Sequence, residues 1–482
     1  MTDGAQALAD GPALLARGGT WHLIGAGGIG VSGIARLLKA RGIDVQGSDV
    51  RESQITLALR AEGIRVAIGH RAENLDGADI VVVSTAIPAA NPELLAAKAR
   101  GLRVLHRSEA LGALVDQTRS VGVIGTHGKG TVSGAITWLL EGAGLQPGFV
   151  IGGLLLNWGT NARPPVNVNG QQWLVAEVDE SDGSLVNSHP VIAVLNNLEL
   201  DHLHYYPEWP KLEAAVLRYF HANPRLQVAV VNRDDLGCHK ILAKLALPQG
   251  AKLVTFGFEG EPTVRGRNLL NRRMTGGFDV EVRGDDGNYT SLGAIEISLP
   301  GKYNASNLLG AVATAWSQGL PWAAIAKAAT TYQGLENRFT LVDAAGVEVV
   351  KDYISHPTGI KRVLEAARAQ AEGPVVAVFK PYRFTMIHYL MDDYRQAFKD
   401  ADKAVVTELY TAGEVPIAGT DVHVLCAKIR EVTGDVTYVH ALDDIPAWLH
   451  ANVSAPATVL FFGGDDLFRV ADRYAQQRTA AG

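Results

Sequence analysis

The stretch Gly125-Thr126-His127-Gly128-Lys129-Gly130-Thr131 follows an apolar run over residues 120–124 and precedes a helical pattern over residues 131–143. Between a buried strand and a helix, glycine amides, one lysine and a hydroxyl are the groups that bind nucleotide phosphates and Mg²⁺. Val123 stands at the usual first glycine and Gly130 at the usual hydroxyl, so Thr131 is the candidate hydroxyl. The alternative is a glycine-rich turn with a solvated lysine. The strand-loop-helix context favours the phosphate site.

A second glycine-rich turn, Gly25-Ala26-Gly27-Gly28-Ile29-Gly30, follows residues 21–24 and opens a helical pattern over 30–40. Such a turn lets backbone amides approach a diphosphate at a helix N-terminus. Asp49 follows about twenty residues later, at the spacing of an acid that binds a ribose or sugar hydroxyl. The pattern does not separate a nicotinamide cofactor from a UDP-sugar, and a tight turn without ligand remains the alternative.

Acidic residues follow two further strands. Glu177, Asp179, Glu180 and Asp182 come at the end of a strand over 173–178, and His202 follows a strand over 191–196. Ligands of open α/β sheets lie at the carboxyl ends of strands, where Mg²⁺ is held by phosphates and one or two carboxylates. The alternatives are a solvated acidic loop and a structural histidine.

Buried strands alternate with helices along most of the chain, which predicts an α/β protein with parallel, doubly wound sheets. The later strands are expected over 347–352, 375–379, 404–407 and 458–462, and Gly-rich alternation over 255–299 predicts antiparallel hairpins. A length of 482 residues suits three domains. We place them at residues 1–118, 119–333 and 334–482.

The composition excludes several classes of function. Lys and Arg number 44 against 50 Asp and Glu, a net charge of −6, which gives no footprint for nucleic acid. Two cysteines, Cys238 and Cys426, cannot build a disulfide framework and suit a reducing compartment. No run of about 18 apolar residues predicts a membrane span, and residues 1–19 lack the pattern of a signal peptide. We therefore expect a cytoplasmic protein that binds no membrane.

These motifs together resemble the Mur ligase family, over nearly the whole chain and most closely its alanine-adding branch. The resemblance extends beyond the segments above to further motifs: residues 24–35, Gly47-Ser48-Asp49, His106-Arg107-Ser108-Glu109, residues 302–307, Asn337-Arg338-Phe339, Asp352-Tyr353, His356-Pro357-Thr358 and residues 410–414. It implies a Rossmann-like UDP-sugar domain, a central ATPase domain with a parallel sheet and a small antiparallel sheet, and a Rossmann-like C-terminal domain. The implied enzyme activates a carboxylate with ATP and Mg²⁺ as an acyl phosphate. It then joins an amino acid to UDP-N-acetylmuramate for peptidoglycan synthesis.

The resemblance also implies roles for individual residues. The phosphate loop Gly125, Thr126, His127, Gly128, Lys129, Gly130 and Thr131 would bind ATP, with Lys129 on the β- and γ-phosphates. Thr131 and Glu177 would hold one Mg²⁺ and His202 a second. Asn304 and Asn307 would meet the adenine, and Arg338 and Asp352 would engage ATP after domain closure. The UDP-sugar would meet Gly25, Gly27, Gly28, Ile29, Gly30, Asp49, Ser84, His106 and Arg107. The amine acceptor would meet His356, Arg383 and Met386, and Lys129, His202, Arg338 and His356 would be catalytic.

Several positions depart from the alanine-adding pattern. Gly130 after the lysine is similar to the folylpolyglutamate synthases, while Ser355, Gly359, Tyr382 and Met386 replace His, Glu, His and Arg. Residues 138–140 and 147–153 look like murein-peptide ligases. The partners we expect are a UDP-linked sugar acid and an amino acid or short peptide, with the chain a monomer or homodimer. A ligase with a changed acceptor, a non-catalytic nucleotide-binding homologue and, last, an oxidoreductase remain as alternatives.

Overall fold

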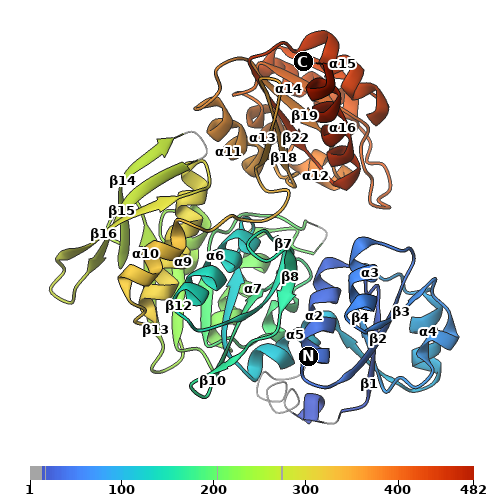
Figure 1. Cartoon of the computed structure of the whole chain (residues 1–482), viewed down its shortest axis with the longest axis vertical. Coiled ribbons are helices and arrows are strands. Elements are labelled where there is room, and N and C mark those ends of the chain that lie inside the picture. Colours follow the sequence, from blue (N-terminus) through green and yellow to red (C-terminus); the bar gives the residue numbers. More distant parts are fainter. Residues whose placement is uncertain (1–12, 17, 204, 273–274, 482) are drawn as a thin grey trace. The chain divides into compact units, whose positions relative to one another are not determined.

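The computed structural model describes residues 13–16, 18–203, 205–272 and 275–481 (Figure 1). Most of the segment read for a signal peptide, residues 1–12 and 17, therefore lies outside the described residues. The chain divides into two compact units. The first comprises Met1–Asn268, Phe278–Glu296 and Ser306–Leu335, and the second comprises Leu269–Gly277, Ile297–Ala305 and Glu336–Gly482.

The first unit begins with a five-stranded parallel sheet in the order β3-β2-β1-β4-β5. Its strands are β1 (Thr20–Ile24), β2 (Asp44–Asp49), β3 (Arg65–Ile68), β4 (Ile80–Val83) and β5 (Arg103–His106). Its helices are α2 (Ile29–Ala40), α3 (Gln54–Ala61), the 3-10 helix η1 (Ala72–Leu75), α4 (Pro92–Ala99) and α5 (Arg107–Asp116). Because all five strands are parallel, the turns after β1, β2, β3 and β4 meet at one edge of the sheet.

The first unit continues with a mixed sheet of eleven strands, whose centre is parallel in the order β13-β12-β11-β6-β10-β7. Its strands are β6 (Arg119–Ile124), β7 (Gly148–Leu155), β8 (Thr160–Arg163), β9 (Asn167–Val168), β10 (Gln171–Glu177), β11 (Ile192–Leu195), β12 (Val228–Asn232), β13 (Lys252–Gly257), β14 (Val264–Arg272), β15 (Thr275–Arg283) and β16 (Tyr289–Ile297). The helices are α6 (Lys129–Gly142), the 3-10 helix η2 (Ser184–Asn187), α7 (Trp209–His221), α8 (Leu236–Leu242), α9 (Lys302–Ser317) and α10 (Trp322–Ala329). The strands expected as inserted hairpins continue this sheet, since β14 pairs in parallel with β13.

The second unit holds a six-stranded sheet in the order β17-β18-β22-β19-β20-β21, in which only β17 runs antiparallel to its neighbour. Its strands are β17 (Thr340–Ala344), β18 (Val347–Asp352), β19 (Val375–Phe379), β20 (Lys403–Val406), β21 (Asp435–Tyr438) and β22 (Ala457–Phe462). Its helices are α11 (Pro357–Arg368), α12 (Phe384–Tyr389), α13 (Met391–Ala397), α14 (Val422–Thr433), the 3-10 helix η3 (Leu442–Asp444), α15 (Ile445–Asn452) and α16 (Asp465–Ala481).

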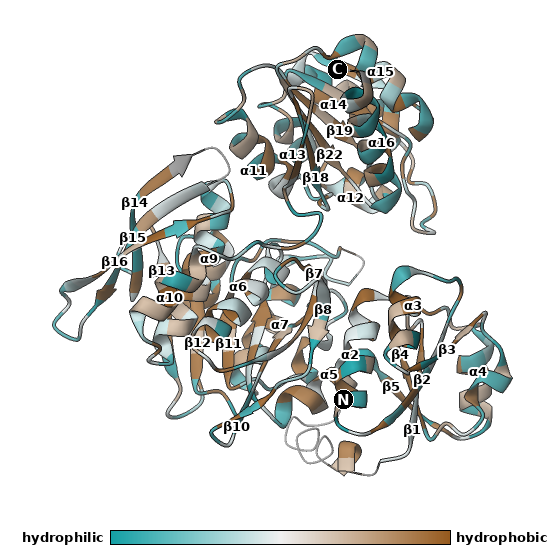
Figure 2. Ribbon diagram, viewed as in Figure 1, coloured by the Kyte–Doolittle hydropathy of each residue, from teal (hydrophilic) through white to brown (hydrophobic). Residues whose placement is uncertain are grey.

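The hydropathy pattern explains the layers of each sheet. The central strands are mostly hydrophobic, whereas the covering helices, such as α16, carry hydrophilic residues (Figure 2). The strands β11 and β19 are buried along their whole length, as strands covered on both faces must be. The α/β fold class expected from the sequence is thus confirmed. Within the described residues, no helix is long and apolar enough to cross a membrane.

Candidate functional site

The phosphate loop joins β6 to α6 at the carboxyl edge of the eleven-stranded sheet. Gly128 is the N-cap of α6 in the left-handed conformation, with φ 73°, and Gly125 has φ 141°. A Cβ at Gly128 would lie 2.8 Å from Oδ1 of Asn307, so this position has no space for a side chain. Asn196 donates to Asn307 Oδ1 at 2.8 Å and to the carbonyl oxygen of His127 at 3.1 Å. The loop is thereby fixed with its amides at a helix N-terminus, which favours an anion.

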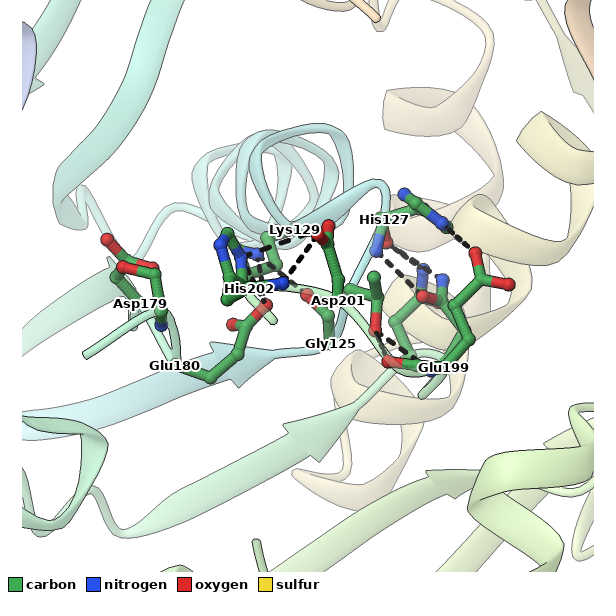
Figure 3. Close-up of polar contacts among 12 residues, drawn as sticks. Gly125, His127, Lys129, Asp179, Glu180, Glu199, Asp201 and His202 are labelled. Carbon is green, nitrogen blue, oxygen red and sulfur yellow. Dashed lines mark hydrogen bonds and ion pairs between the residues drawn. The ribbon is translucent and has the colours of Figure 1, made fainter. Parts of the chain in front are cut away.

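Lys129 has an acidic partner in this structure. Its Nζ donates to the carbonyl oxygen of Gly125 at 2.8 Å and to Glu180 Oε1 at 2.9 Å (Figure 3). Burial would lower the pKa of Lys129, but the carboxylates of Glu180, Asp179 and Glu177 outweigh it and raise that pKa. The lysine therefore stays charged at neutral pH, as a ligand for phosphate oxygens requires.

Glu180 is the residue at this site that sequence reasoning did not single out. The residue is only 2% exposed, so the solvated-loop alternative is wrong for Glu180. Its carbonyl oxygen accepts the hydroxyl of Tyr206 at 2.9 Å, and His202 Nε2 lies 3.7 Å from its Oε1. Its Oε2 is buried and has no hydrogen-bond partner among the described residues. No sequence signal distinguished Glu180 from its acidic neighbours, because the pairing with Lys129 spans 51 residues.

Position 130 faces the carboxylate that is expected to bind metal. A Cβ on Gly130 would lie 3.2 Å from Glu177 Oε2 and 2.7 Å from Leu335 Cδ1. The same Glu177 oxygen accepts the amide N–H of Gly152 at 2.6 Å. Thr131 is buried one residue further into α6, where its carbonyl oxygen accepts the hydroxyl of Tyr332 at 2.8 Å. Leu335 thus fills the space that a hydroxyl-bearing side chain at position 130 would take.

The donor set fits Mg²⁺. Hard oxygen ligands suit this ion, and the orphaned Oε2 of Glu180 lies in the same acidic segment as Glu177. His202, which has a positive φ of 53°, adds a ring nitrogen. Carboxylates without a compensating cation are costly to bury. The structure therefore brings Lys129, Glu177 and His202 to one edge of the sheet, as the motifs predicted for an open α/β sheet.

The glycine-rich turn lies at the carboxyl edge of the five-stranded sheet. Gly25 has φ 76°, and Gly28 is the N-cap of α2. The N–H of Gly27 donates to Asp49 Oδ2 at 2.9 Å, so the acid at the end of β2 closes the turn after β1. The carbonyl oxygen of Ile29 accepts the side-chain amide of Asn161, and Ser84 follows β4 at the same edge.

Arg107 lies between the glycine-rich turn after β1 and the acidic segment after β10. It forms an ion pair with Asp179 in the acidic segment, and its Nη1 is 3.4 Å from where a Cβ on Gly30 would stand. Burial would raise the pKa of Asp179, but Lys129 and Arg107 lower it. The neighbouring His106 lies 3.3 Å from Asp182, and burial lowers the pKa of this histidine.

Three of the residues expected to meet ATP belong to the second unit: Asn304, Arg338 and Asp352. Asn304 donates to the carbonyl oxygen of Pro300 at 2.8 Å, one turn along α9 from Asn307. Arg338 Nη1 lies 3.6 Å from Asp352 Oδ1. Burial raises the pKa of Asp352 to about 6, although Arg338 and the N–H of Phe339 lower it.

The residues expected to meet the amine also lie in the second unit. His356 is the N-cap of α11, where its side chain accepts the N–H of Thr358. Arg383, with φ 67°, pairs with Glu414 at 3.2 Å and lies beside Met386 in sequence. Tyr382 stacks on Tyr410 with ring centroids 5.3 Å apart, a contact between segments 28 residues distant in sequence.

Three family models match the chain in order. They are the Mur ligase family catalytic domain over residues 20–119, the Mur ligase middle domain over 123–315 and the Mur ligase glutamate ligase domain over 337–464. The chain belongs to the Mur ligase family, and it is an ATP-dependent ligase that forms amide bonds.

Curated relatives and solved structures show which members of the family this chain is similar to. The UDP-N-acetylmuramate–L-alanine ligase of Rhizorhabdus wittichii is 36% identical over 455 residues, covering 93% of this chain and 95% of the relative. The fold is similar to the UDP-N-acetylmuramate-alanine ligase of Thermotoga maritima, with TM-score 0.78, 23% identity and coverage of 96% and 100%. It is also similar to a murein peptide ligase of Psychrobacter arcticus, with TM-score 0.71, 22% identity and coverage of 96% and 99%.

Proposed function

We propose that this chain joins an amino acid to the carboxylate of UDP-N-acetylmuramate, in the synthesis of a peptidoglycan precursor in the cytoplasm. The name of the relative in Rhizorhabdus wittichii supports this substrate. The observation that carries the proposal is Lys129, held charged at a helix N-terminus within a group of carboxylates. We further propose three domains, residues 1–118, 119–333 and 334–482, acting as a monomer or homodimer.

The first step is transfer of the γ-phosphoryl group of ATP to the sugar acid. Lys129 exchanges Glu180 for the β- and γ-phosphates, which keeps its positive charge compensated throughout. The amides of the loop from Gly125 to Thr131 bind the phosphates, since they lie at the N-terminus of α6. Positioning and electrostatics supply most of the catalysis in phosphoryl transfer.

Magnesium completes this site. Glu177, Thr131 and His202 would hold Mg²⁺, with Glu180 nearby, and the ion would neutralise phosphate charge when bound. Asn304 and Asn307 would meet the adenine. Arg338 and Asp352 of the second unit would engage ATP and exclude water from the acyl phosphate, which water would otherwise hydrolyse.

The sugar nucleotide would bind at the five-stranded sheet. The amides of Gly25, Gly27, Gly28 and Gly30 would meet the diphosphate, and Asp49 would accept a ribose hydroxyl. Because Arg107 pairs with Asp179 in the present structure, the diphosphate would take the place of that carboxylate. Arg107 would thereby connect the occupancy of the sugar site with the charge around Lys129.

A second candidate, a ligase with a changed amine acceptor, is favoured by the residues around Arg383. Glu414 already neutralises this arginine, and Met386 supplies no charge. Tyr382 and Tyr410 present an aromatic surface instead. A charged hydrogen bond contributes about 1.5–3 kcal/mol, so the loss of one guanidinium would weaken binding of a small amino acid held by its carboxylate.

Phosphate release tests both candidates. The enzyme is incubated with ATP, Mg²⁺ and UDP-N-acetylmuramate against a panel of single amino acids and short peptides, and the product is identified by mass. Turnover with L-alanine, glycine or serine supports the first candidate. Turnover with a peptide or a larger amino acid alone supports the second, and turnover that ignores UDP-N-acetylmuramate contradicts both.

A further inference from the structure

The sheet of the second unit has a point at which the helices that follow its strands change face. Helices α11, α13 and α14 pack on one face of this sheet, and α15 and α16 pack on the other (Figure 1). The chain leaves β18 and β19 toward the first face, but it leaves β22, the strand between them, toward the second. The loops at the carboxyl ends of these strands therefore diverge, and such a point is where open α/β sheets bind their ligands.

Three tyrosines gather at this point of the sheet. Tyr353 directly follows β18, Tyr382 follows β19 by three residues, and Tyr410 follows β20 by four. Tyr353 and Tyr410 are 55% and 52% exposed, whereas most large side chains of the unit are buried. Burial, together with the nearby Asp465, Tyr382 and Tyr410, raises the pKa of the Tyr353 hydroxyl, so the three rings are neighbours.

The three rings are held in place by the protein itself. The N–H of Arg383 donates to the carbonyl oxygen of Tyr410 at 2.8 Å, and the N–H of Tyr410 donates to that of Pro381 at 2.9 Å. These two bonds fix the stacked pair of Tyr382 and Tyr410. The ring of Tyr353 packs edge-on against Phe468 of α16, with centroids 6.1 Å apart. A surface that is already ordered costs little conformational entropy when a ligand packs on it.

The cations beside these rings decide between two kinds of ligand. Tyrosine rings can bind an ammonium or guanidinium group, or they can pack against another ring. Each of the three rings already has a cation of this chain near it: Arg338 Cζ lies 5.9 Å from the ring centroid of Tyr353, Lys380 Nζ 5.7 Å from that of Tyr410, and Arg383 Cζ 5.2 Å from that of Tyr382. These positive charges would repel a cationic side chain but not an uncharged aromatic ring.

We propose that the amine acceptor of this ligase is an amino acid with an uncharged aromatic side chain, which packs on the rings of Tyr353, Tyr382 and Tyr410. The inference rests on the proposed function, and it names the acceptor that the second candidate leaves open. The methyl group of alanine is too small to cover these rings. Contact between aromatic rings favours an aromatic side chain over an aliphatic one of the same size.

Steady-state phosphate release tests the proposal on the full chain, with ATP, Mg²⁺ and UDP-N-acetylmuramate present and the product identified by mass. The acceptors are L-phenylalanine, L-cyclohexylalanine, which has the same size without aromatic character, and L-alanine. The variants are Tyr410→Ala and, as a matched control, Tyr389→Ala, which removes an exposed ring of α12 that is not one of the three. Hydroxamate formed from hydroxylamine without any amino acid reports whether the first step is intact in each variant.

The wild type and Tyr389→Ala are expected to show a kcat/KM for L-phenylalanine about 3- to 10-fold above L-cyclohexylalanine and at least about 10-fold above L-alanine. In Tyr410→Ala the preference over L-cyclohexylalanine falls to near unity, while hydroxamate formation is unchanged. A wild type that prefers either of the other acceptors, or a Tyr410→Ala variant that keeps the preference or loses hydroxamate formation, overturns the assignment. Absence of hydroxamate from the wild type would instead overturn the proposed function, and the assigned acceptor with it.

Discussion

The two glycine-rich turns, Gly25–Gly30 and Gly125–Thr131, are built alike and charged differently. Each follows a buried strand, and each opens a helix with a glycine N-cap, Gly28 in one and Gly128 in the other. In the first turn an acid, Asp49, accepts a backbone N–H. In the second an acid, Glu180, accepts the ammonium group of Lys129.

This difference separates binding from chemistry. Backbone amides suffice to hold a diphosphate that does not react. A phosphoryl group in transfer carries changing charge and needs a side-chain cation close to it. We infer that the chain uses the same turn twice, with the lysine only where a bond is broken.

The largest expected effect comes from removing Lys129, the feature that distinguishes the second turn from the first. Lys129→Ala should reduce ATP turnover by about 10²- to 10³-fold, the usual cost of losing one electrostatic group aimed at the reacting charge. UDP binding at the first turn should change far less, and only through the Arg107–Asp179 ion pair. Phosphate release and UDP titration measure the two effects, and turnover near the wild-type rate would contradict the role given to Lys129.

A side chain placed in the first turn should impair binding of the sugar nucleotide and leave ATP binding intact. A Cβ on Gly27 would lie 2.9 Å from Asp49 Oδ2 and 2.8 Å from Thr56 Cγ2. In Gly27→Ala these side chains must shift at a cost of about 1–3 kcal/mol, so KM for the sugar nucleotide should rise by about 10- to 100-fold. KM for ATP should remain at the wild-type value, and a rise in both constants would argue against separate turns.

Asp352, an acid of the second unit that is expected to engage ATP, should make the stability of the protein depend on pH. Because the pKa of Asp352 is raised to about 6, the native state binds more protons than the unfolded state between about pH 4 and pH 6. The free energy of unfolding attributable to this group therefore falls as pH rises through that window, by about 2–3 kcal/mol at 1.36 kcal/mol per pKa unit. Urea unfolding of the wild type and Asp352→Asn at pH 4.5 and 7 measures it. Equal pH dependence of the two proteins would contradict the shift.

The smallest expected effect is on the free energy of unfolding, when the glycine at position 130 is replaced by the hydroxyl residue usual in this loop. Gly130→Thr places a Cβ 2.7 Å from Leu335 Cδ1, the flexible end of a side chain. We expect a loss of about 1 kcal/mol in the free energy of unfolding, at the lower end for overpacking. The double variant with Leu335→Ala should show a smaller added cost from the threonine than the single variant does. Additive losses in urea unfolding would show that the two positions are not coupled.

Local patterns predicted the elements well because buried strands such as β19 and β22 are short apolar runs between turns. They also predicted the edge where Lys129, Glu177 and His202 come together, since strand ends of a parallel sheet share one edge. The addition of β14, β15 and β16 to the central sheet was not predictable, because strand partners are chosen by contacts distant in sequence.

Glu180 shows the limit for the site itself. It is one polar residue just beyond a strand, and nothing in the local sequence marks it. Its place in the site depends on Lys129, which is 51 residues away in sequence.

Trapping of the activated carboxylate tests the central claim most directly. Hydroxylamine, added without any amino acid, converts an acyl phosphate to a hydroxamate, so the assay does not depend on the acceptor. We predict the hydroxamate of UDP-N-acetylmuramate in the wild type when ATP and Mg²⁺ are present, and its loss in Lys129→Ala. No hydroxamate from the wild type, or hydroxamate formed equally without ATP, would contradict the account.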